Sequence, residues 1–106
     1  MIYIVDTIQV EPKDTDKYLE LVEKVGAPAM IAAGMTFVSC WATSRELGED
    51  VSIQAVWSCR DHVQFNDFRK NMVLSPKWHE FADKAAAIRK GGFRRFYYPP
   101  NFSPMK

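Results

Sequence analysis

The sequence predicts a single α+β domain whose elements follow the order β-α-β-β-α-β. Segments rich in β-branched and aromatic residues lie near both ends and in the middle of the 106-residue chain, with apolar residues at helical spacing between them. This length suits one hydrophobic core. A split βαβ order predicts a four-stranded antiparallel sheet with helices on one face, the ferredoxin-like architecture. We expect the domain to span residues 1–98 and residues 99–106 to form an irregular tail.

The first half of the chain begins with a strand and a broken helix. Residues 2–10 are rich in Ile, Val, Tyr and Thr, which is typical of a strand. Asp14 or Thr15 can cap the following helix. We expect that helix to kink or restart at Pro28 and to stop at Gly34.

A hairpin is expected in the middle of the chain. Residues 35–43 and 51–57 are both β-rich, and the polar segment 44–50 between them suits the connection of two paired strands. These two strands should therefore pair antiparallel.

The second helical region is expected in two pieces. Ser58 and Asp61 offer N-caps for the first piece, and Ser75-Pro76 has the residue types favoured at the start of the second. We expect Gly91-Gly92 to end this region and residues 93–98 to form the last strand, before the two prolines that follow.

Both faces of the predicted sheet carry apolar side chains. In the first strand Ile2, Ile4 and Ile8 alternate with Tyr3 and Val5, whereas a sheet face in contact with water would be more polar. A chain of this length buries only roughly two thirds of its unfolded surface by itself. The uncovered face should therefore pack on the same face of a second copy, which predicts a two-fold homodimer.

Charge and composition argue against several classes of partner. The chain has 14 Lys and Arg and 13 Asp and Glu residues, a net charge of +1, so neither nucleic acid nor an anionic membrane is an expected partner. The first ten residues lack a basic leader, and we expect a cytoplasmic location. Cys40 and Cys59 are expected to be reduced. Phosphate-binding loops, dinucleotide fingerprints and serine-nucleophile elbows are absent from the sequence.

Four short motifs occur in order along the chain: Met1-Ile2-Tyr3, Val10-x-Pro12 followed by Tyr18-Leu19, Val56-Trp57, and Ser75-Pro76-Lys77-Trp78-His79-Glu80-Phe81. Together they resemble the dimeric α+β barrel superfamily, and most closely its NIPSNAP-like proteins. The resemblance implies a sheet-to-sheet dimer with a pocket between each sheet and its helices. It does not imply one reaction, because relatives include cofactor-free monooxygenases, polyketide cyclases, lactone isomerases and haem-degrading enzymes. A helix tryptophan of the haem-degrading relatives is absent near Phe68, so haem is not expected.

Three polar residues are candidates for proton transfer. His79 follows the inward-facing Trp78, and His62 falls in the first turn of its helix, where the helix dipole favours a neutral ring. Either histidine could equally be an ordinary surface residue. Asp6 lies inside the first strand, where Asp is unusual, and it either pairs with Arg94 or Arg95 or faces an apolar pocket as an acid or base.

A metal site is not expected. Cys59 and His62 have the spacing of two ligands, but a second pair at ligand spacing is missing from the sequence, and no cofactor is expected either.

Aromatic residues are the candidates for substrate binding, with simple core packing as the alternative. The alanines near positions 29–33 and 82–86 either let helices approach closely or leave a void beside these rings, suited to a planar apolar ligand. The candidates are Tyr3, Phe37, Trp41, Trp57, Phe65 and Trp78.

The resulting hypothesis is a homodimer that binds a small apolar aromatic, polyketide-like or isoprenoid metabolite. It would perform cofactor-free acid-base chemistry of the cyclase or isomerase type. One alternative is a cofactor-free monooxygenase, and another is a binding or assembly protein without catalysis.

Overall fold

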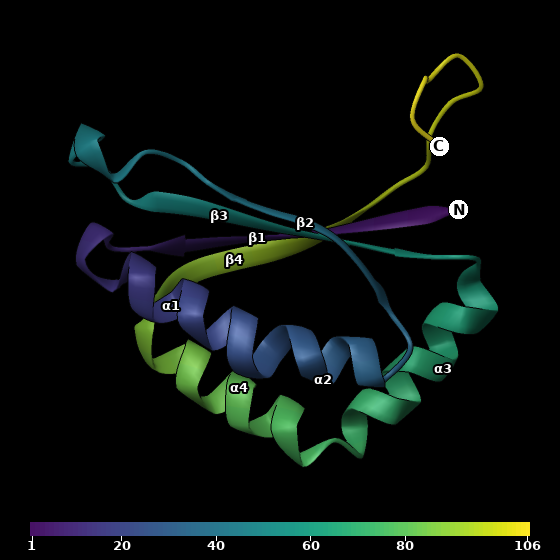
Figure 1. The fold of residues 1–106 in the computed structure, drawn as a ribbon, viewed down its shortest axis with the longest axis horizontal. Coiled ribbons are helices and arrows are strands. Elements are labelled where there is room, and N and C mark those ends of the chain that lie inside the picture. The colour runs from purple at the N-terminus through teal and green to yellow at the C-terminus, as the bar shows by residue number, and fades with distance from the viewer.

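A twisted antiparallel sheet with all its helices on one side forms the structure (Figure 1). The computed structural model describes residues 1–106, apart from the side chain of Leu47. The predicted α+β class and the β-α-β-β-α-β order are confirmed. The elements are β1 (Ile2–Val10), η1 (Pro12–Asp14), α1 (Thr15–Leu21), η2 (Val22–Gly26), α2 (Ala27–Ala32), β2 (Thr36–Ala42), η3 (Arg45–Leu47), β3 (Val51–Cys59), α3 (His62–Val73), α4 (Pro76–Ile88) and β4 (Arg89–Tyr97).

The four strands lie in the order β2-β3-β1-β4, and every neighbouring pair is antiparallel. The first strand is therefore central and pairs on both edges. In its register Asp6 lies opposite Ala55 of β3 on one side and opposite Arg94 of β4 on the other. Residues from the two ends of the chain thus meet in the middle of the sheet.

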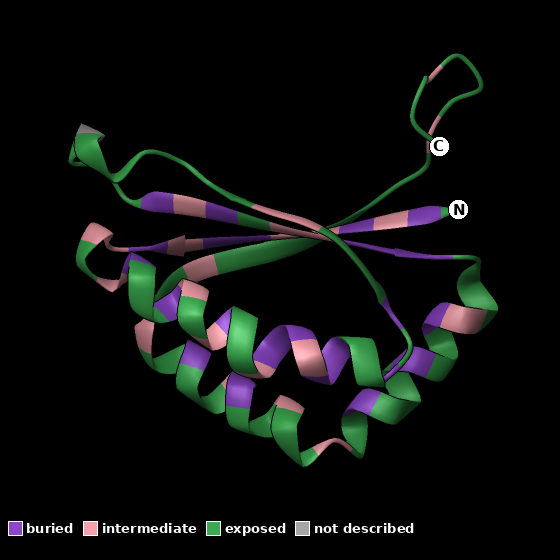
Figure 2. Cartoon of the chain, in the orientation of Figure 1, coloured by how far each residue is buried: buried purple, intermediate pink, exposed green. Residues whose placement is uncertain are grey.

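One face of the sheet packs on the helices and forms the core. Side chains of β1 and β3 that point to this face are almost fully buried, with Ile4, Val10 and Val51 at 0% exposure (Figure 2). Helical side chains such as Tyr18 and Phe68 close the core from the other side. Burial of this apolar surface is the main term that stabilises the fold.

The first helical region is continuous but changes its winding before Pro28. The five residues of η2 form a π-helical segment, and α2 begins directly after it with Pro28 in its first turn, as the predicted restart requires. Proline lacks the N–H group that would donate a hydrogen bond to the preceding turn. A change of winding at this point therefore accommodates the missing hydrogen bond. Gly34 ends the region with a φ of 116°.

The second helical region is split as predicted. Asp61 caps α3 by accepting a 2.9 Å hydrogen bond from the Gln64 amide, and Ser75 caps α4 by accepting one of 3.2 Å from the Trp78 amide. Of the two caps considered for the first piece, Asp61 is the one used. Ser58 lies inside β3.

The expected helix end at Gly91-Gly92 is wrong, because α4 stops at Ile88 and both glycines lie inside β4. Gly92 faces Ile8 across the strand pair, and a Cβ atom there would lie 2.5 Å from Ile8 Cδ1 and 2.9 Å from the Thr7 carbonyl oxygen. This glycine therefore marks a close approach between two strands instead of a helix end.

The other face of the sheet has no helix over it in the described structure (Figure 1). Large side chains remain exposed there, including Trp41 at 62%, Phe93 at 49% and Tyr97 at 47%. We call this side the open face. The irregular tail after β4 rises on the same side, away from the helices.

Candidate functional site

A cavity of about 370 Å³ lies between the covered face of the sheet and the helices. Its volume falls within the range of about 300–1,000 Å³ that is typical of small-molecule sites. Strands β1, β3 and β4 form one wall, and α1, η2, α2 and α4 form the other. The residues used below are Asp6, Tyr18, Trp57, Trp78, Phe81, Ala82, Ala85, Arg89 and Arg94.

Asp6 and Arg94 form the main polar group in this cavity wall. Arg94 donates from Nε to Asp6 Oδ1 at 2.6 Å and from Nη2 to Oδ2 at 3.0 Å, a two-point contact between neighbouring strands. The side chains are only 20% (Asp6) and 33% (Arg94) exposed. The predicted pairing of Asp6 with an arginine of the last strand is confirmed, and Arg94 is the partner.

The pair leaves Asp6 with spare bonding capacity. A carboxylate has about four acceptor positions, and Arg94 uses one on each oxygen. The remaining positions can accept a hydrogen bond or a proton from a molecule in the cavity. The geometry is therefore compatible with both a structural and a chemical role for Asp6.

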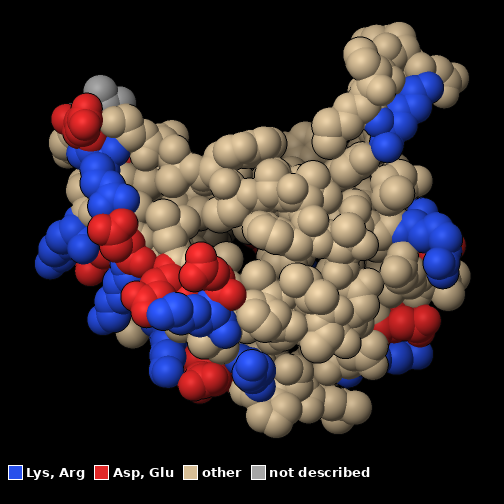
Figure 3. Space-filling view, viewed as in Figure 1, with Lys and Arg blue, Asp and Glu red and all other residues tan. Residues whose placement is uncertain are grey.

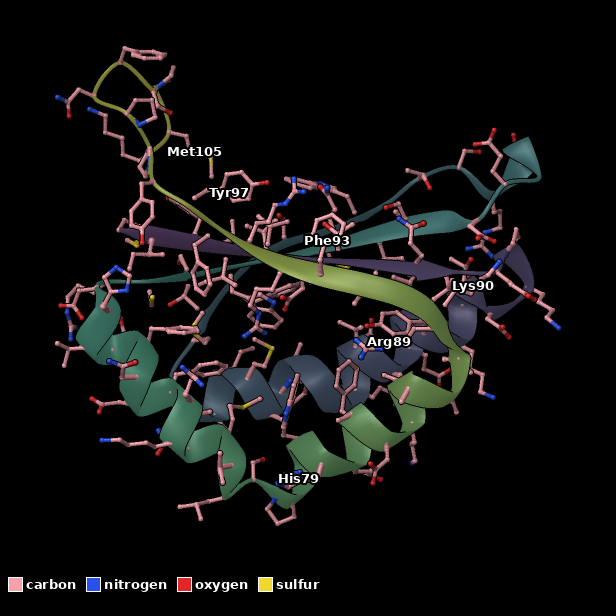
Figure 4. The ribbon with its side chains drawn as sticks, turned by 180° about the vertical axis from the view of Figure 1, so that it is seen from behind. His79, Arg89, Lys90, Phe93, Tyr97 and Met105 are labelled. Atoms are coloured by element: carbon pink, nitrogen blue, oxygen red, sulfur yellow. The ribbon has the colours of Figure 1, made fainter. Side chains whose placement is uncertain are left out.

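Tyr18 brings a second polar group to the cavity from α1. Burial raises the pKa of Tyr18 to about 12; the positive charge of Arg89 lowers it, and the negative charge of Asp6 raises it. The phenol therefore keeps its proton at neutral pH and can donate a hydrogen bond. Arg89 lies at the start of β4 and points toward the helices (Figure 4).

Aromatic rings give the cavity a flat apolar character. The rings of Trp78 and Phe81 lie 5.2 Å apart, and Phe81 meets Tyr18 edge-on at 6.2 Å. On the sheet side Trp57 is only 2% exposed, and Phe37 packs on it at 4.9 Å. A planar molecule can lie between such rings.

The small residues of the helices allow close helix packing at one point and leave open space at another. Gly26 lies so close to Phe81 that an added Cβ would be 2.7 Å from the ring, so the helices approach closely there. Ala82 and Ala85 of α4 line the cavity itself. A larger side chain at either alanine would occupy the space that is open now.

Neither candidate histidine lines this cavity. His79 is exposed and its Nε2 donates to the Val73 carbonyl oxygen at 2.9 Å, which ties it to the turn between α3 and α4 (Figure 4). His62 forms a 3.0 Å hydrogen bond through Nε2 with the hydroxyl of Tyr98, beside the start of the tail. Both rings therefore have structural partners outside the cavity.

The six aromatic candidates separate into three groups. Trp57 and Trp78 line the cavity. Phe37 and Phe65 point to the covered face but pack on other rings, Phe37 on Trp57 and Phe65 on Phe68 and Phe96. Tyr3 and Trp41 lie on the open face, opposite Ser58 and Gln54 of β3. The cavity thus brings together two of the six with Asp6.

The residues that the sequence reasoning did not select as site residues are Tyr18, Arg89 and Phe81. Tyr18 and Phe81 lie on the apolar sides of their helices, and helical spacing alone does not separate a cavity wall from a packed core. Arg89 faces the cavity because an irregularity in the pairing of β1 with β4 places it opposite Val10. A local shift of register of this kind has no clear signature in the sequence.

No three or more His, Cys, Asp or Glu side chains gather closely enough to hold a metal ion among the residues that the structure describes. Burial raises the pKa of the Cys59 thiol, as it does for Cys40. Within the same described part of the chain, no helix has the length and apolar character needed to cross a membrane.

Comparison with known proteins gives a consistent family and fold. A family model described as NIPSNAP matches residues 3–104. A NIPSNAP family protein with unknown function from Agrobacterium tumefaciens is 20% identical, with a TM-score of 0.84 over 100% of this chain and 94% of that chain. An uncharacterized NIPSNAP domain protein from Burkholderia xenovorans is 17% identical, with a TM-score of 0.81 over 98% of this chain and 99% of that one.

A more distantly similar solved structure is that of an enzyme. SnoaB, described as a cofactor-independent oxygenase from Streptomyces nogalater, is 18% identical, with a TM-score of 0.59 over 97% of this chain and 96% of that chain. At this identity the likeness shows the shared ferredoxin-like fold. A comparison with curated protein sequences gives no match.

Proposed function

The chain belongs to the NIPSNAP family, and we propose that it binds a small planar apolar metabolite in the cavity and moves a proton on it with Asp6. The observation that carries this proposal is the Asp6–Arg94 pair in the wall of a cavity whose other lining residues, apart from Arg89, are mostly aromatic and aliphatic. An apolar pocket with a few convergent polar groups is the usual form of a small-molecule site. Aromatic, polyketide-like and isoprenoid metabolites all fit this description.

The proposed chemistry is proton transfer at a carbon next to a carbonyl group. The Asp6 carboxylate takes the proton, and the negative charge that develops on the substrate oxygen lies in a cavity that also contains Arg94 and the Tyr18 hydroxyl. Returning the proton at the same or another carbon gives exchange or isomerisation, and attack by the carbanion on a second carbonyl gives cyclisation. This proton transfer uses only the substrate and the side chains of the cavity, and it requires no cofactor.

We further propose that the protein acts as a homodimer joined through the open face. Trp41, Phe93 and Tyr97 are exposed there, and no helix of the described structure covers them. In Figure 3, Lys, Arg, Asp and Glu atoms lie at the hairpin end, over α1 and at the edge near α3, while the upper margin of the molecule between the hairpin and the tail shows none of them. A second copy of the same face would bury this surface by two-fold pairing.

A cofactor-free monooxygenase is the second candidate. The observation that favours it is the set of rings from Trp57, Trp78 and Phe81 around the cavity, which would hold an electron-rich phenol in place. In this case the substrate itself must react with oxygen, and oxygen uptake with phenolic probes separates this reaction from simple proton transfer. Binding without either reaction would identify a binding or assembly protein.

Deuterium exchange tests the acid-base proposal. 2-Tetralone is a planar aromatic ketone with acidic hydrogens next to its carbonyl, and exchange in D₂O can be followed by NMR. We expect the protein to raise the exchange rate above the protein-free background. Asp6→Asn should lower the protein-dependent rate by about 100-fold or more, the contribution typical of a general base, because it removes the proton acceptor while preserving the shape.

Asp16→Asn is the matched control, because Asp16 also pairs with an arginine, Arg45 at 2.7 Å, but lies on the exposed outer surface of α1. It should leave exchange unchanged. If Asp6→Asn stays folded and exchanges as fast as the original protein, Asp6 is not the base. If the original protein causes no exchange but binds the ketone, the protein is a binding protein and not a proton-transfer enzyme.

A further inference from the structure

Trp57 has a feature that the proposed function leaves unused. Its indole Nε1 is fully enclosed and has no hydrogen-bond partner among the described residues, although the side chain is 2% exposed and lines the cavity. Buried polar groups in folded proteins almost always have a partner. An enclosed N–H group without one destabilises the fold unless something else supplies the acceptor.

The surroundings of Trp57 limit where that acceptor can come from. Its neighbours across the sheet are Ile4 on one side and Phe37 on the other, and neither side chain has an oxygen or nitrogen atom. Trp57 is also among the residues that line the cavity, and a small turn of its ring would bring Nε1 into contact with a molecule bound there. Such a molecule can therefore provide the missing acceptor.

We infer that Trp57 selects ligands with a carbonyl oxygen, which accepts a hydrogen bond from Nε1. This inference rests on the proposed function, because it names the chemical class of ligand for the same cavity. An indole N–H can only donate, so the group opposite it must be an acceptor. A carbonyl on a planar aromatic framework satisfies the N–H and fits between the aromatic rings.

The position of Trp57 relative to Asp6 supports a ketone. Asp6 lies opposite Ala55, and Trp57 is two residues further along the same face of β3. Diagonal neighbours of this kind are about 7–8 Å apart. One carbonyl group with its neighbouring carbon can span the space between two such side chains. The oxygen then lies at Trp57 and the acidic hydrogen at Asp6, so Trp57 acts as a positioning donor for the ketone.

Fluorenone and fluorene test the inference because they have nearly the same shape and only fluorenone has a carbonyl. We expect the protein to bind fluorenone more tightly than fluorene, by about 2- to 10-fold, the effect of one hydrogen bond. Trp57→Phe retains an aromatic ring without the N–H, so the ratio of the two affinities should fall to about one, whatever the change in the apolar wall does to the binding of both probes. Binding is measured by equilibrium dialysis.

Trp78→Phe is the matched control, because Trp78 also lines the cavity but its indole nitrogen is not among the enclosed, unpaired atoms of the described residues. Trp78→Phe should change the affinities for fluorenone and fluorene by about the same factor. Infrared spectroscopy of fluorenone bound to the unmodified protein gives a readout that needs no variant, since a hydrogen bond lowers the carbonyl stretching frequency.

The possible results separate the inference from the proposed function. Equal binding of the two probes, a preference that persists in Trp57→Phe, or an unshifted carbonyl frequency would overturn the role of Trp57 and leave the cavity as a binding site. If neither probe binds, the proposed function fails and the inference fails with it.

Discussion

On the covered face of the sheet the charged groups are few, and Asp6 with Arg94 forms an ion pair at the cavity. On the open face, exposed rings such as Trp41 and Phe93 lie among polar side chains, including Gln9, which donates to Ser52 at 3.0 Å. The same strands therefore present two surfaces with different chemistry. The proposed function places ligand binding on the covered face and the proposed self-association on the open face.

This difference shows that the role of an apolar residue in the sheet depends on whether the helices cover the face to which it points. An apolar residue on the covered face contributes to the core or to the cavity, whereas one on the open face has no counterpart within the described chain. The assignment of each face can be tested separately, because neighbouring residues of a strand point to opposite faces.

The largest expected effect comes from a charge on the open face. Phe93→Glu should weaken the proposed dimer by about 30-fold or more, because two-fold pairing brings the new carboxylate into the apolar contact from both copies. Light scattering at micromolar protein should change from about twice the 12.2 kDa chain mass toward the chain mass itself. Ligand binding in each monomer should persist, because the Phe93 side chain points to the open face although the residue is part of the cavity wall.

Val63→Glu is the control for this charge, because Val63 is 68% exposed on α3 and lies outside the sheet. It should remain dimeric. A monomeric parent protein at micromolar concentration would refute the assignment of the open face.

A smaller effect is expected where the two strands β1 and β4 approach closely. Gly92→Ala places a methyl group 2.5 Å from Ile8 Cδ1 on the covered face, and overpacking of this kind destabilises a protein by about 1–3 kcal/mol. Gly91→Ala is a matched control, since nothing lies within 4 Å of a Cβ atom there. Urea unfolding measures both, and equal stabilities would show that the covered face relaxes easily at this point.

The smallest effect concerns Tyr18 and pH. Its pKa rises from 10.0 to about 12 on folding, so between these pH values the unfolded chain has lost a proton that the folded chain retains. Stability should therefore fall by about 2 kcal/mol as the pH rises through this window. Tyr18→Phe should remove this part of the fall in urea unfolding, and an identical pH dependence in the variant would show that Tyr18 is not desolvated.

Much of the fold could be predicted because local signals agreed with one another. The first strand was predicted over residues 2–10 and is found there, since its composition and flanking turn both favour a strand. The caps at Asp61 and Ser75 follow from short-range hydrogen bonds that depend on few residues. Gly91 and Gly92 were predicted to end a helix, but they lie inside a strand. Glycine is common both at helix ends and where two strands approach closely, and only the contact of Gly92 with Ile8 shows that the second case applies here.

The candidate site was harder to predict because it depends on which face a side chain points to. Phe37 and Trp41 are four residues apart in one strand, and regular alternation along a strand would place them on the same face. The pairing of β2 with β3 shifts between Phe37 and Ser39, which moves Trp41 to the open face. The choice of Arg94 over Arg95 as the partner of Asp6 likewise depends on register, which the sequence does not define.

The central claim is that the cavity on the covered face is the binding site, and Ala85→Trp tests it most directly. Ala85 lines the cavity and is buried, so an indole there should fill it, with only a modest loss of stability. Ala86→Trp, on the exposed side of the same helix, is the matched control. By equilibrium dialysis we predict one fluorenone per chain for the parent protein and for Ala86→Trp, and none for a folded Ala85→Trp. Unchanged binding in Ala85→Trp, or its complete unfolding because the alanines are closely packed, would contradict this claim.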